Sequence, residues 1–314
     1  MKIEVIKPGL QSSIQDRGRT GYMHLGVAKG GAIDPLSMTL ANWLVGNAPT
    51  NPVLEICLLG PTLRFKQAVS VAVSGAKFEL EVHSKEGVRS AVNVKQTIQL
   101  NSGDTLAFGK RLQGARAYLA VAGIFNYNAV LGSCATHFSA KFAGLEGRAL
   151  QAGDQLSLSH CEVRQTRTLP IHVVQQYSGT YLLRCVPSVE TSHFSPAQLS
   201  QFYTRSYLLR SDSNRMGLRF DGEPLSMNDM DELISSGLSQ GSVQFPPSGL
   251  PIIASVDGQT IGGYPRIANV ISADLFALGQ LVAGDKVSFS LVSLEQAHDI
   301  YVSQQRQLAP YLDA

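Results

Sequence analysis

The sequence lacks the patterns that mark several classes of protein. Its four cysteines lie at positions 57, 134, 161 and 185 with no C-x-x-C pair, which argues against a zinc site and against a dense disulfide framework. The seven histidines show no i, i+4 or H-x-H clustering, so we expect no histidine-built metal site. Reduced thiols in a cytoplasmic protein fit these absences best.

An excess of charge of one sign is absent as well. The 26 basic residues nearly balance the 24 acidic ones, so the sequence has no electrostatic footprint for nucleic acid or an anionic membrane. No apolar run approaches membrane-spanning length, and residues 1–7 alternate as a strand does, without the apolar core of a signal peptide. We therefore expect a cytoplasmic globular protein without nucleic-acid or membrane partners.

What the sequence does contain is a series of short alternating strands. We predict strands at 54–58, 62–65, 69–73, 78–82, 97–100 and 118–121. One helix is well marked over 35–45, because Asp34 is a natural N-cap, Pro35 suits the first helical position and Gly46 can end it. The fold class is therefore mainly β with a few short helices.

The chain of 314 residues suggests about two domains. The regular pattern is lost around residues 160–170, so we predict a β-rich N-terminal domain over 1–165 and a C-terminal β-barrel domain over 166–314. The second domain opens with a strand at 181–186 and ends with a helix at 294–308. Three Gly-Asp pairs, at 103–104, 153–154 and 284–285, each precede an alternating strand, and we interpret their aspartates as turn formers.

The stretch 243–267 combines unusual backbone chemistry with few polar side chains. An apolar run at 252–256 ends at Asp257, and Gly262-Gly263-Tyr264-Pro265 follows, in which the glycines permit close approach and the proline restricts Tyr264. Two interpretations stay open on this local evidence. Asp257-Gly258 is either a hairpin turn or part of one wall of a functional site.

A second polar stretch breaks every periodicity at 16–24. Asp16, Arg17, Arg19, Tyr22 and His24 lie within nine positions, which suits either a loop folded around a polar ligand or a solvated surface loop. Further polar candidates are Asn42 on the predicted helix, Arg215 at a turn, and Ser133 in a segment that could present backbone N–H groups to an anion. Gly237-Leu-Ser-Gln-Gly matches G-x-S-x-G, but a strand follows it where a nucleophile elbow requires a helix.

Taken together, the motifs resemble the allophanate hydrolase subunit 2 family, which includes the C subunits of 5-oxoprolinases. The resemblance covers nearly the whole chain. It is carried by Ser13-Ile-Gln-Asp-Arg-Gly-Arg-Thr-Gly-Tyr, Gly31-Ala-Ile-Asp-Pro, Ala41-Asn-Trp-Leu-Val-Gly-Asn, Leu131-Gly-Ser, Arg215-Met-Gly, Val243-Gln-Phe-Pro-Pro-Ser-Gly and residues 257–265. The family is also similar to part of the carboxyltransferase region of biotin-dependent urea carboxylase.

The resemblance implies cyclophilin-like β-barrels and a role as one member of an ATP-dependent amide hydrolase complex. The implied reaction is the opening of 5-oxoproline to glutamate, together with separately encoded partners that resemble the A and B subunits of 5-oxoprolinase. Allophanate hydrolysis and biotin-dependent carboxyl transfer are alternatives, although no biotin is expected on this chain. A non-catalytic module that antagonises a kinase inhibitor is another.

The resemblance also implies roles for individual residues. An activated amide needs arginines for phosphate oxygens, a carboxylate to orient water and N–H donors for the oxyanion. The implied catalytic residues are Asp257, Tyr264 and Arg215, and the implied substrate-binding residues are Gln15, Asp16, Arg17, Arg19, Tyr22, His24, Asn42, Ser133, Gln244, Gly262 and Gly263. We expect the 16–24 loop and the 257–265 stretch to be facing walls of one site.

Two positions depart from the family pattern. Cys134-Ala135-Thr136 stands where the family usually has Arg-Ser-Thr, and Gly123-Ile124 stands where it has two glycines. The first departure removes an arginine that could contact an anion.

Overall fold

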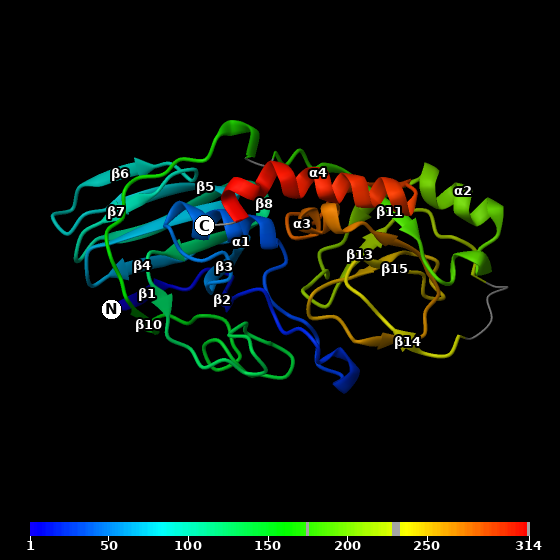
Figure 1. Cartoon of the computed structure of the whole chain (residues 1–314), viewed down its shortest axis with the longest axis horizontal. Helices are drawn as coiled ribbons and strands as arrows, with labels where there is room; N and C mark the ends of the chain where they lie inside the picture. Colours follow the sequence, from blue (N-terminus) through cyan, green and yellow to red (C-terminus); the bar gives the residue numbers. More distant parts are fainter. Residues whose placement is uncertain (174–175, 228–232, 313–314) are drawn as a thin grey trace. The chain divides into compact units, whose positions relative to one another are not determined.

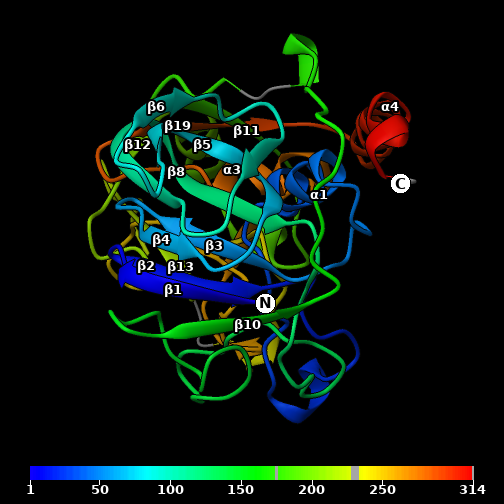
Figure 2. The same cartoon turned by 90° about the vertical axis from the view of Figure 1, so that its left-hand side faces the viewer.

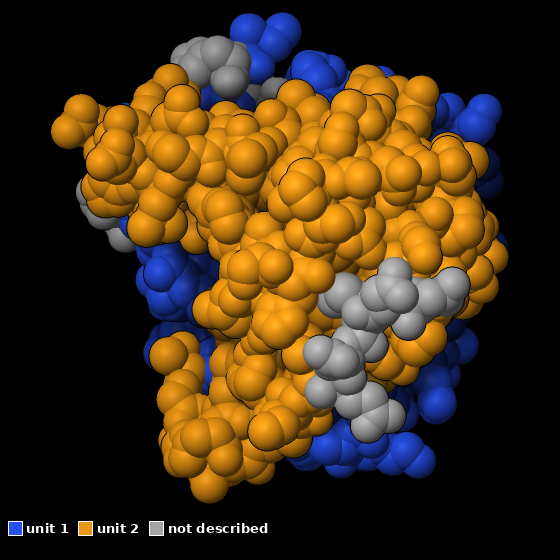
Figure 3. All heavy atoms as spheres, turned by 90° about the vertical axis from the view of Figure 1, so that its right-hand side faces the viewer, with its two compact units in different colours: residues 1–19, 30–177, 308–314 blue, residues 20–29, 178–307 orange. Residues whose placement is uncertain are grey.

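The structure is a computed structural model that describes residues 1–173, 176–227 and 233–312. The chain forms two compact units, coloured separately in Figure 3. Unit 1 comprises residues 1–19, 30–177 and 308–314, and unit 2 comprises residues 20–29 and 178–307. The chain passes from unit 1 to the main part of unit 2 after residue 177, whereas the predicted domain boundary lies after residue 165. The limits of the two domains stay a prediction.

Unit 1 is built around one large sheet (Figures 1 and 2). Its described strands are β1 (Lys2–Lys7), β2 (Gln11–Gln15), β3 (Val53–Cys57), β4 (Thr62–Phe65), β5 (Val69–His83), β6 (Arg89–Val92), β7 (Ile98–Leu100), β8 (Thr105–Val121), β9 (Ile124–Phe125) and β10 (Gln155–Ser159). They pair in the order β2-β3-β8-β4-β1-β10-β9, and β5 pairs with β6, β7 and β8. The pairing of β5 with β8 is the longest in the sheet.

The long strand β5 corrects the predicted strand pattern. The predicted strands 69–73 and 78–82 are one strand, and the predicted strand 118–121 is only the end of β8. Between Gly75 and Leu80 the register with β8 shifts repeatedly, and Gly75 has a φ of 90°. Because a bulge changes which face successive side chains occupy, the alternation is interrupted and the sequence appears to contain two strands.

Helix α1 (Pro35–Leu44) begins where the sequence predicts. The Asp34 carboxylate accepts from the Ser37 N–H at 2.9 Å and from the Ser37 hydroxyl at 2.6 Å, which satisfies donors that a helix N-terminus otherwise leaves free. Gly46 follows the helix with a φ of 67°. The predicted range 35–45 is therefore confirmed to within one residue.

Unit 2 is a closed barrel, which confirms the predicted mainly β fold class. Its strands are β11 (Thr180–Pro187), β12 (Ser206–Leu209), β13 (Gly217–Asp221), β15 (Ser242–Gln244), β16 (Ile252–Ala254), β18 (Arg266–Val270) and β19 (Lys286–Leu291). Two further strands, β14 (Ser236–Gly237) and β17 (Ile261–Gly262), form a separate small sheet. Helix α2 (Pro196–Thr204) has a capping box between Ser195 and Gln198, and its Phe202 packs on Phe245 and Phe289 in the barrel core.

The remaining described helices are short except for α4 (Leu294–Leu312), which extends four residues beyond the predicted range. They are η1 (Met23–Leu25), η2 (Ile171–Val173), η3 (Thr191–His193), η4 (Ser272–Asp274) and α3 (Leu275–Leu278). Among the described residues, no helix is both long and apolar enough to cross a membrane.

The three Gly-Asp turns share one geometry, as the sequence predicts. The glycines Gly103, Gly153 and Gly284 have φ values of 96°, 92° and 91°. Each aspartate accepts from a backbone N–H three residues earlier, at 2.8 Å for Asp104, 2.7 Å for Asp154 and 2.8 Å for Asp285. Their interpretation as turn formers is confirmed, and the same turn occurs in both units.

Candidate functional site

The barrel of unit 2 carries a cavity of about 620 Å³. It is formed by β17 with the residues on either side of it, by residues that follow β15, and by residues between β13 and β14. Its described lining residues are Met227, Leu233, Ser235, Phe245, Pro247, Gln259, Ile261, Gly262, Gly263, Tyr264 and Pro265. The Gly262-Gly263-Tyr264-Pro265 segment that the sequence identified as the wall of a site therefore does line a cavity.

The glycines of this wall allow polar side chains to approach the backbone closely. A Cβ at Gly262 would lie 2.9 Å from the Gln244 amide nitrogen and 3.1 Å from the Gln259 amide nitrogen. A Cβ at Gly263 would lie 3.2 Å from the Ser235 hydroxyl. A side chain at either position would make these neighbouring groups shift.

Tyr264 and Gln244 occupy different depths in this wall. Tyr264 is 46% exposed and lines the cavity, as the sequence led us to expect of a rigidly presented side chain. Gln244 is buried, and its amide donates to the Tyr264 carbonyl at 3.4 Å. Gln244 therefore supports the backbone of the wall from behind.

Arg266 fixes the small sheet that contains this wall. Its guanidinium forms a two-pronged ion pair with Glu190, including a bond of 2.6 Å from Nε, and donates to the Ser236 hydroxyl at 2.7 Å and the Gly237 carbonyl at 2.5 Å. Arg266 hydrogen bonding lowers the pKa of Glu190, and the same bond raises the pKa of Arg266. Since β14 pairs with β17, this ion pair holds the cavity wall in place.

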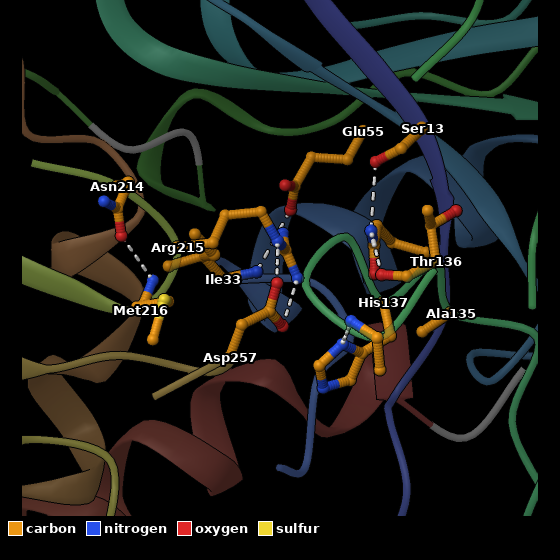
Figure 4. A network of polar contacts seen from close by, with 12 residues as sticks. Ser13, Ile33, Glu55, Ala135, Thr136, His137, Asn214, Arg215, Met216 and Asp257 are labelled. Carbon is orange, nitrogen blue, oxygen red and sulfur yellow. Dashed lines mark hydrogen bonds and ion pairs between the residues drawn. The ribbon is translucent and has the colours of Figure 1, made fainter. Parts of the chain in front are cut away.

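The structure brings together two predicted catalytic residues, Arg215 and Asp257 (Figure 4). Arg215 donates from Nε and Nη2 to the two carboxylate oxygens at 2.7 and 3.1 Å, and both side chains are at most 5% exposed. The Asp257 N–H also donates to the Arg215 carbonyl at 2.9 Å. A carboxylate held on both oxygens in this way fixes the turn that contains it.

The topology rules out the hairpin interpretation of Asp257-Gly258. Strand β16 pairs with β13 and β15, whereas β17 pairs with β14, so the turn at Asp257 connects two separate sheets. Neither Asp257 nor Arg215 belongs to the described lining of the cavity. Their catalytic roles stay predictions, and the geometry shows them positioning the chain that leads into the wall.

The polar residues of the 16–24 loop divide into a buried and an exposed group. In unit 1, the Asp16 carboxylate accepts from Gly18 N–H at 2.7 Å, from the Ser133 hydroxyl at 2.6 Å and from Cys134 N–H at 2.7 Å. Ser133 N–H donates to the Val130 carbonyl at 3.3 Å. The backbone that the sequence assigned to an external anion is thus bound to the protein's own carboxylate, and its oxyanion role stays a prediction.

Arg19 and Gln15 reinforce the same contact between distant segments. Arg19 is almost completely buried, donates to the Ala135 and Val130 carbonyls at 2.5 and 3.2 Å, and lies over the Phe142 ring at 4.6 Å. The Gln15 amide donates to the Thr136 carbonyl at 3.3 Å and to the Ser13 hydroxyl at 3.0 Å. Both side chains hold segment 130–137 against the end of β2.

Arg17 and His24 are exposed, and Tyr22 is half-buried. Asn42 is fully buried in α1, donates to the Asn51 carbonyl at 2.9 Å and accepts from the Asn47 amide at 3.3 Å. Its amide therefore has a structural task, while a ligand role for any of these residues stays a prediction. Residues 20–29 belong to unit 2 and Asp16 to unit 1, and the facing of the 16–24 loop and the 257–265 stretch also stays a prediction.

Cys134 stands where the family pattern has arginine, and its side chain is a neutral thiol. Burial raises the pKa of its thiol, with a further contribution from Asp16. The thiol donates to the Tyr127 carbonyl at 3.2 Å. This position therefore supplies no cation for an anionic ligand.

Sequence reasoning missed a buried polar network in unit 1. The Tyr118 hydroxyl donates to Glu55 at 2.8 Å and accepts from Asp34 N–H at 2.9 Å. Glu55 also accepts from Ile33 N–H at 3.1 Å, and both of these residues are labelled in Figure 4. Burial, and then the charge of Glu55, raise the pKa of Tyr118 well above its ordinary value. The sequence analysis assigned no role to Glu55, whose partner Tyr118 is 63 positions away.

Cavity residues were missed too. Gln259 lay within the stretch that the sequence identified and was not assigned a role, whereas Ser235 and Met227 carry no recognisable sequence signal. Among the described residues, no group of three or more histidine, cysteine or acidic side chains is placed to hold a metal ion.

The charge of the cavity wall bears on whether ATP could bind there. Phosphate oxygens require arginine, lysine or a set of free backbone N–H groups. None of the described lining residues of the cavity is basic. The described lining therefore offers phosphate oxygens no cationic side chain.

Three comparisons with known proteins agree with one another. The family model described as "Carboxyltransferase domain, subdomain A and B" matches residues 25–291. The chain is 36% identical to the 5-oxoprolinase C subunit of Haemophilus influenzae, covering 98% of each chain, and 36% identical to the 5-oxoprolinase C subunit of Escherichia coli, covering 97% of this chain and 96% of that one. The crystal structure of Kluyveromyces lactis urea carboxylase superposes with a TM-score of 0.89 at 28% identity, over 99% of this chain and 29% of that chain.

Proposed function

The chain belongs to the carboxyltransferase domain family, subdomains A and B, and we propose that it is the C subunit of a 5-oxoprolinase. In this proposal it works with separately encoded A and B subunits in the ATP-dependent opening of 5-oxoproline to glutamate. The supporting observation is the 36% identity with two 5-oxoprolinase C subunits, which extends over nearly the full length of each.

The chemistry of the cavity is compatible with a lactam substrate. A lactam carbonyl is a poor electrophile, so its opening requires donors for the oxygen that gains negative charge. Gln259, Ser235 and Tyr264 place an amide and two hydroxyl groups on the cavity wall. In the proposal these groups bind and orient the lactam, and the apolar residues beside them exclude water until it is needed.

In the proposal two ion pairs position this wall. Arg215 and Asp257 fix the turn that precedes β17, and Arg266 with Glu190 fixes its neighbour β14. Because none of the described lining residues is basic, the proposal places ATP outside this cavity and assigns it no step here.

Carboxyl transfer is the second candidate, because the chain also matches urea carboxylase. The chain is 30% identical to urea amidolyase of Saccharomyces cerevisiae over 96% of its own length, but it covers only 17% of that protein. The identity is lower, and the relative is far longer. In this alternative the chain would act on a carboxylated biotin delivered by another protein.

Reconstitution tests the proposal. The full chain is mixed with candidate A and B subunits, and ATP cleavage and glutamate release are followed with 5-oxoproline, allophanate and urea in parallel. We expect glutamate release only from 5-oxoproline and only when all three subunits are present. Equal activity when this chain is omitted would reject a catalytic role and favour the non-catalytic regulatory module.

A further inference from the structure

A small pocket in unit 1 gathers two lysine side chains. It lies beside α1 and β5, has a volume of about 20 Å³, and its described lining residues are Ser37, Leu40, Ser74, Gly75, Lys77, Val94, Lys95, Leu169 and Tyr177. All of them belong to unit 1, and none of them is acidic. Positive charge is therefore collected where the described lining offers no carboxylate to balance it.

An irregularity in β5 brings two polar side chains to the same pocket. Ser74 and Lys77 are three positions apart, so in a regular strand they would point to opposite faces of the sheet. The register of β5 with β8 shifts between Gly75 and Lys77, and Gly75 has a φ of 90°. A bulge redirects the side chains that follow it. Both Ser74 and Lys77 line the pocket as a result.

The Ser74 hydroxyl is available to a ligand in this pocket. Ser74 is 7% exposed, and within the described part of the chain its hydroxyl makes no hydrogen bond. Buried hydroxyl groups are normally bonded, because an unmade hydrogen bond in the interior is unfavourable. An acceptor in the pocket would satisfy this donor.

Neither lysine is neutralised by the residues around it. The Lys77 ammonium donates to the Gln176 amide oxygen at 3.3 Å, which is an uncharged partner. Among the described residues, no carboxylate forms an ion pair with Lys77 or Lys95. Burial, and then the charge of Lys95, lower the pKa of Lys77. The two ammonium groups repel each other next to the buried side chains of Leu40 and Leu169, where water screens charge poorly.

We propose that this pocket binds a chloride ion, held by the ammonium groups of Lys77 and Lys95 and by the Ser74 hydroxyl. An anion would offset the repulsion between the lysines and accept the hydrogen bond that Ser74 offers. A pocket of about 20 Å³ has room for about one water-sized group. A monoatomic anion meets this limit, whereas sulfate and phosphate carry several oxygens and exceed it. The site is separate from the cavity of unit 2 and does not depend on the proposed function.

Chloride NMR on the isolated full chain tests the proposal directly. The chloride signal broadens when the ion exchanges with a site on a protein, and a competing anion removes that broadening. We expect excess broadening that bromide suppresses and that sulfate at equal ionic strength leaves in place. Absence of excess broadening, or equal suppression by sulfate and bromide, would overturn the proposal.

Variants locate the bound ion. Lys77→Gln and Lys95→Gln should each abolish the excess broadening, and Ser74→Ala should weaken chloride binding about fivefold. The matched control is Lys7→Gln, because Lys7 is an exposed lysine on β1 that does not line the pocket. Unchanged broadening in either variant of the pocket lysines, or its loss in Lys7→Gln, would place the ion elsewhere and overturn the proposal.

Thermal unfolding gives a readout that a merely structural role of the lysines would not move. Replacing sodium gluconate by sodium chloride at constant ionic strength should raise the Tm of wild type by about 2 °C, because chloride would bind only the folded protein. Without chloride, Lys95→Gln should melt no lower than wild type, since the repulsion between the lysines is gone.

Two outcomes of the thermal experiment would contradict the chloride site. An equal rise in Tm for wild type and Lys95→Gln would show general screening by salt. A Tm of Lys95→Gln below that of wild type in gluconate would show that Lys95 stabilises the fold without an anion.

Discussion

The 16–19 loop of unit 1 and the cavity wall of unit 2 hold their charged side chains in different ways, although unit 1 also contains one buried ion pair, between Arg116 and Glu55. In unit 1, the Asp16 carboxylate is held by two backbone N–H groups and a serine hydroxyl, and the Arg19 guanidinium donates to backbone carbonyls. In unit 2, Arg266 binds Glu190 and Arg215 binds Asp257, so charges are matched with charges. The first arrangement ties a loop to one conformation. The second consists of two ion pairs, called clamps below, that position the cavity wall. The described residues of that wall include no basic residue.

Removing the carboxylate of Asp16 should have the largest effect on stability. Asp16→Ala would leave two backbone donors and a hydroxyl buried without their acceptor, so we expect the free energy of unfolding to fall by about 4 kcal/mol. Urea denaturation followed by circular dichroism measures the change. Because the lost partners include backbone groups, no second side-chain substitution should restore it, and a single substitution that does so would break the contrast between the units.

The matched control lies on the surface of unit 2. Asp212 pairs with Arg210 in an exposed ion pair. Asp212→Ala should leave the urea midpoint unchanged, since exposed ion pairs contribute little. If Asp212→Ala lowered the free energy of unfolding as much as Asp16→Ala, removal of an exposed aspartate would be equally destabilising. The effect of Asp16→Ala could not then be attributed to the buried contacts of Asp16.

A clamp of unit 2 should respond differently, because its partner is another side chain. Glu190→Leu would leave Arg266 without its carboxylate and should reduce the free energy of unfolding by about 3 kcal/mol. The double variant Glu190→Leu/Arg266→Met removes both charges, and we expect it to recover about 2 kcal/mol of that loss. A double-mutant cycle with no coupling between the two positions would contradict the clamp.

The same clamp predicts a pH dependence. The pKa of Glu190 is lowered in the folded protein, so its contribution is fully present above the ordinary glutamate pKa of 4.5 and is lost as the pH falls through the lowered value. Glu190→Gln should therefore be about 2 kcal/mol less stable than wild type at pH 7, with a difference that shrinks below about pH 4.5. Unfolding curves collected across this range measure the difference, which should not grow on acidification.

The smallest loss of stability should come from the Gly-Asp turn, which occurs in both units. Asp104→Ala in unit 1 and Asp285→Ala in unit 2 each remove the acceptor of one turn N–H, so each should cost about 1 kcal/mol. Thermal unfolding of the two variants gives the comparison. A difference of more than about twofold between them would show that the shared turn has different importance in the two units.

Local chemistry predicted those parts of the molecule that depend on neighbouring residues. Asp34 and Pro35 fixed the start of α1, and each Gly-Asp pair produced its turn. The family resemblance directed attention to Gly262 and Tyr264, which line the cavity. In these cases the causes lie within a few residues of one another.

Contacts between segments far apart in the chain could not be predicted from the sequence. Asp16 and Ser133 are separated by 117 positions, and Arg215 and Asp257 by 42, so neither partner identifies the other along the chain. The continuity of β5 was missed because the register shifts near Gly75 break the alternation. The resemblance implied catalytic roles for Arg215 and Asp257 but did not reveal that the two side chains bind each other.

Steady-state kinetics of the reconstituted complex with wild-type chain and Gly262→Ala test the central claim most directly. If this chain holds the lactam and not the phosphates, Gly262→Ala should raise the KM for 5-oxoproline about tenfold and leave the KM for ATP unchanged. A rise in the KM for ATP, or no change in the KM for 5-oxoproline, would contradict the assignment of the lactam to the cavity of unit 2.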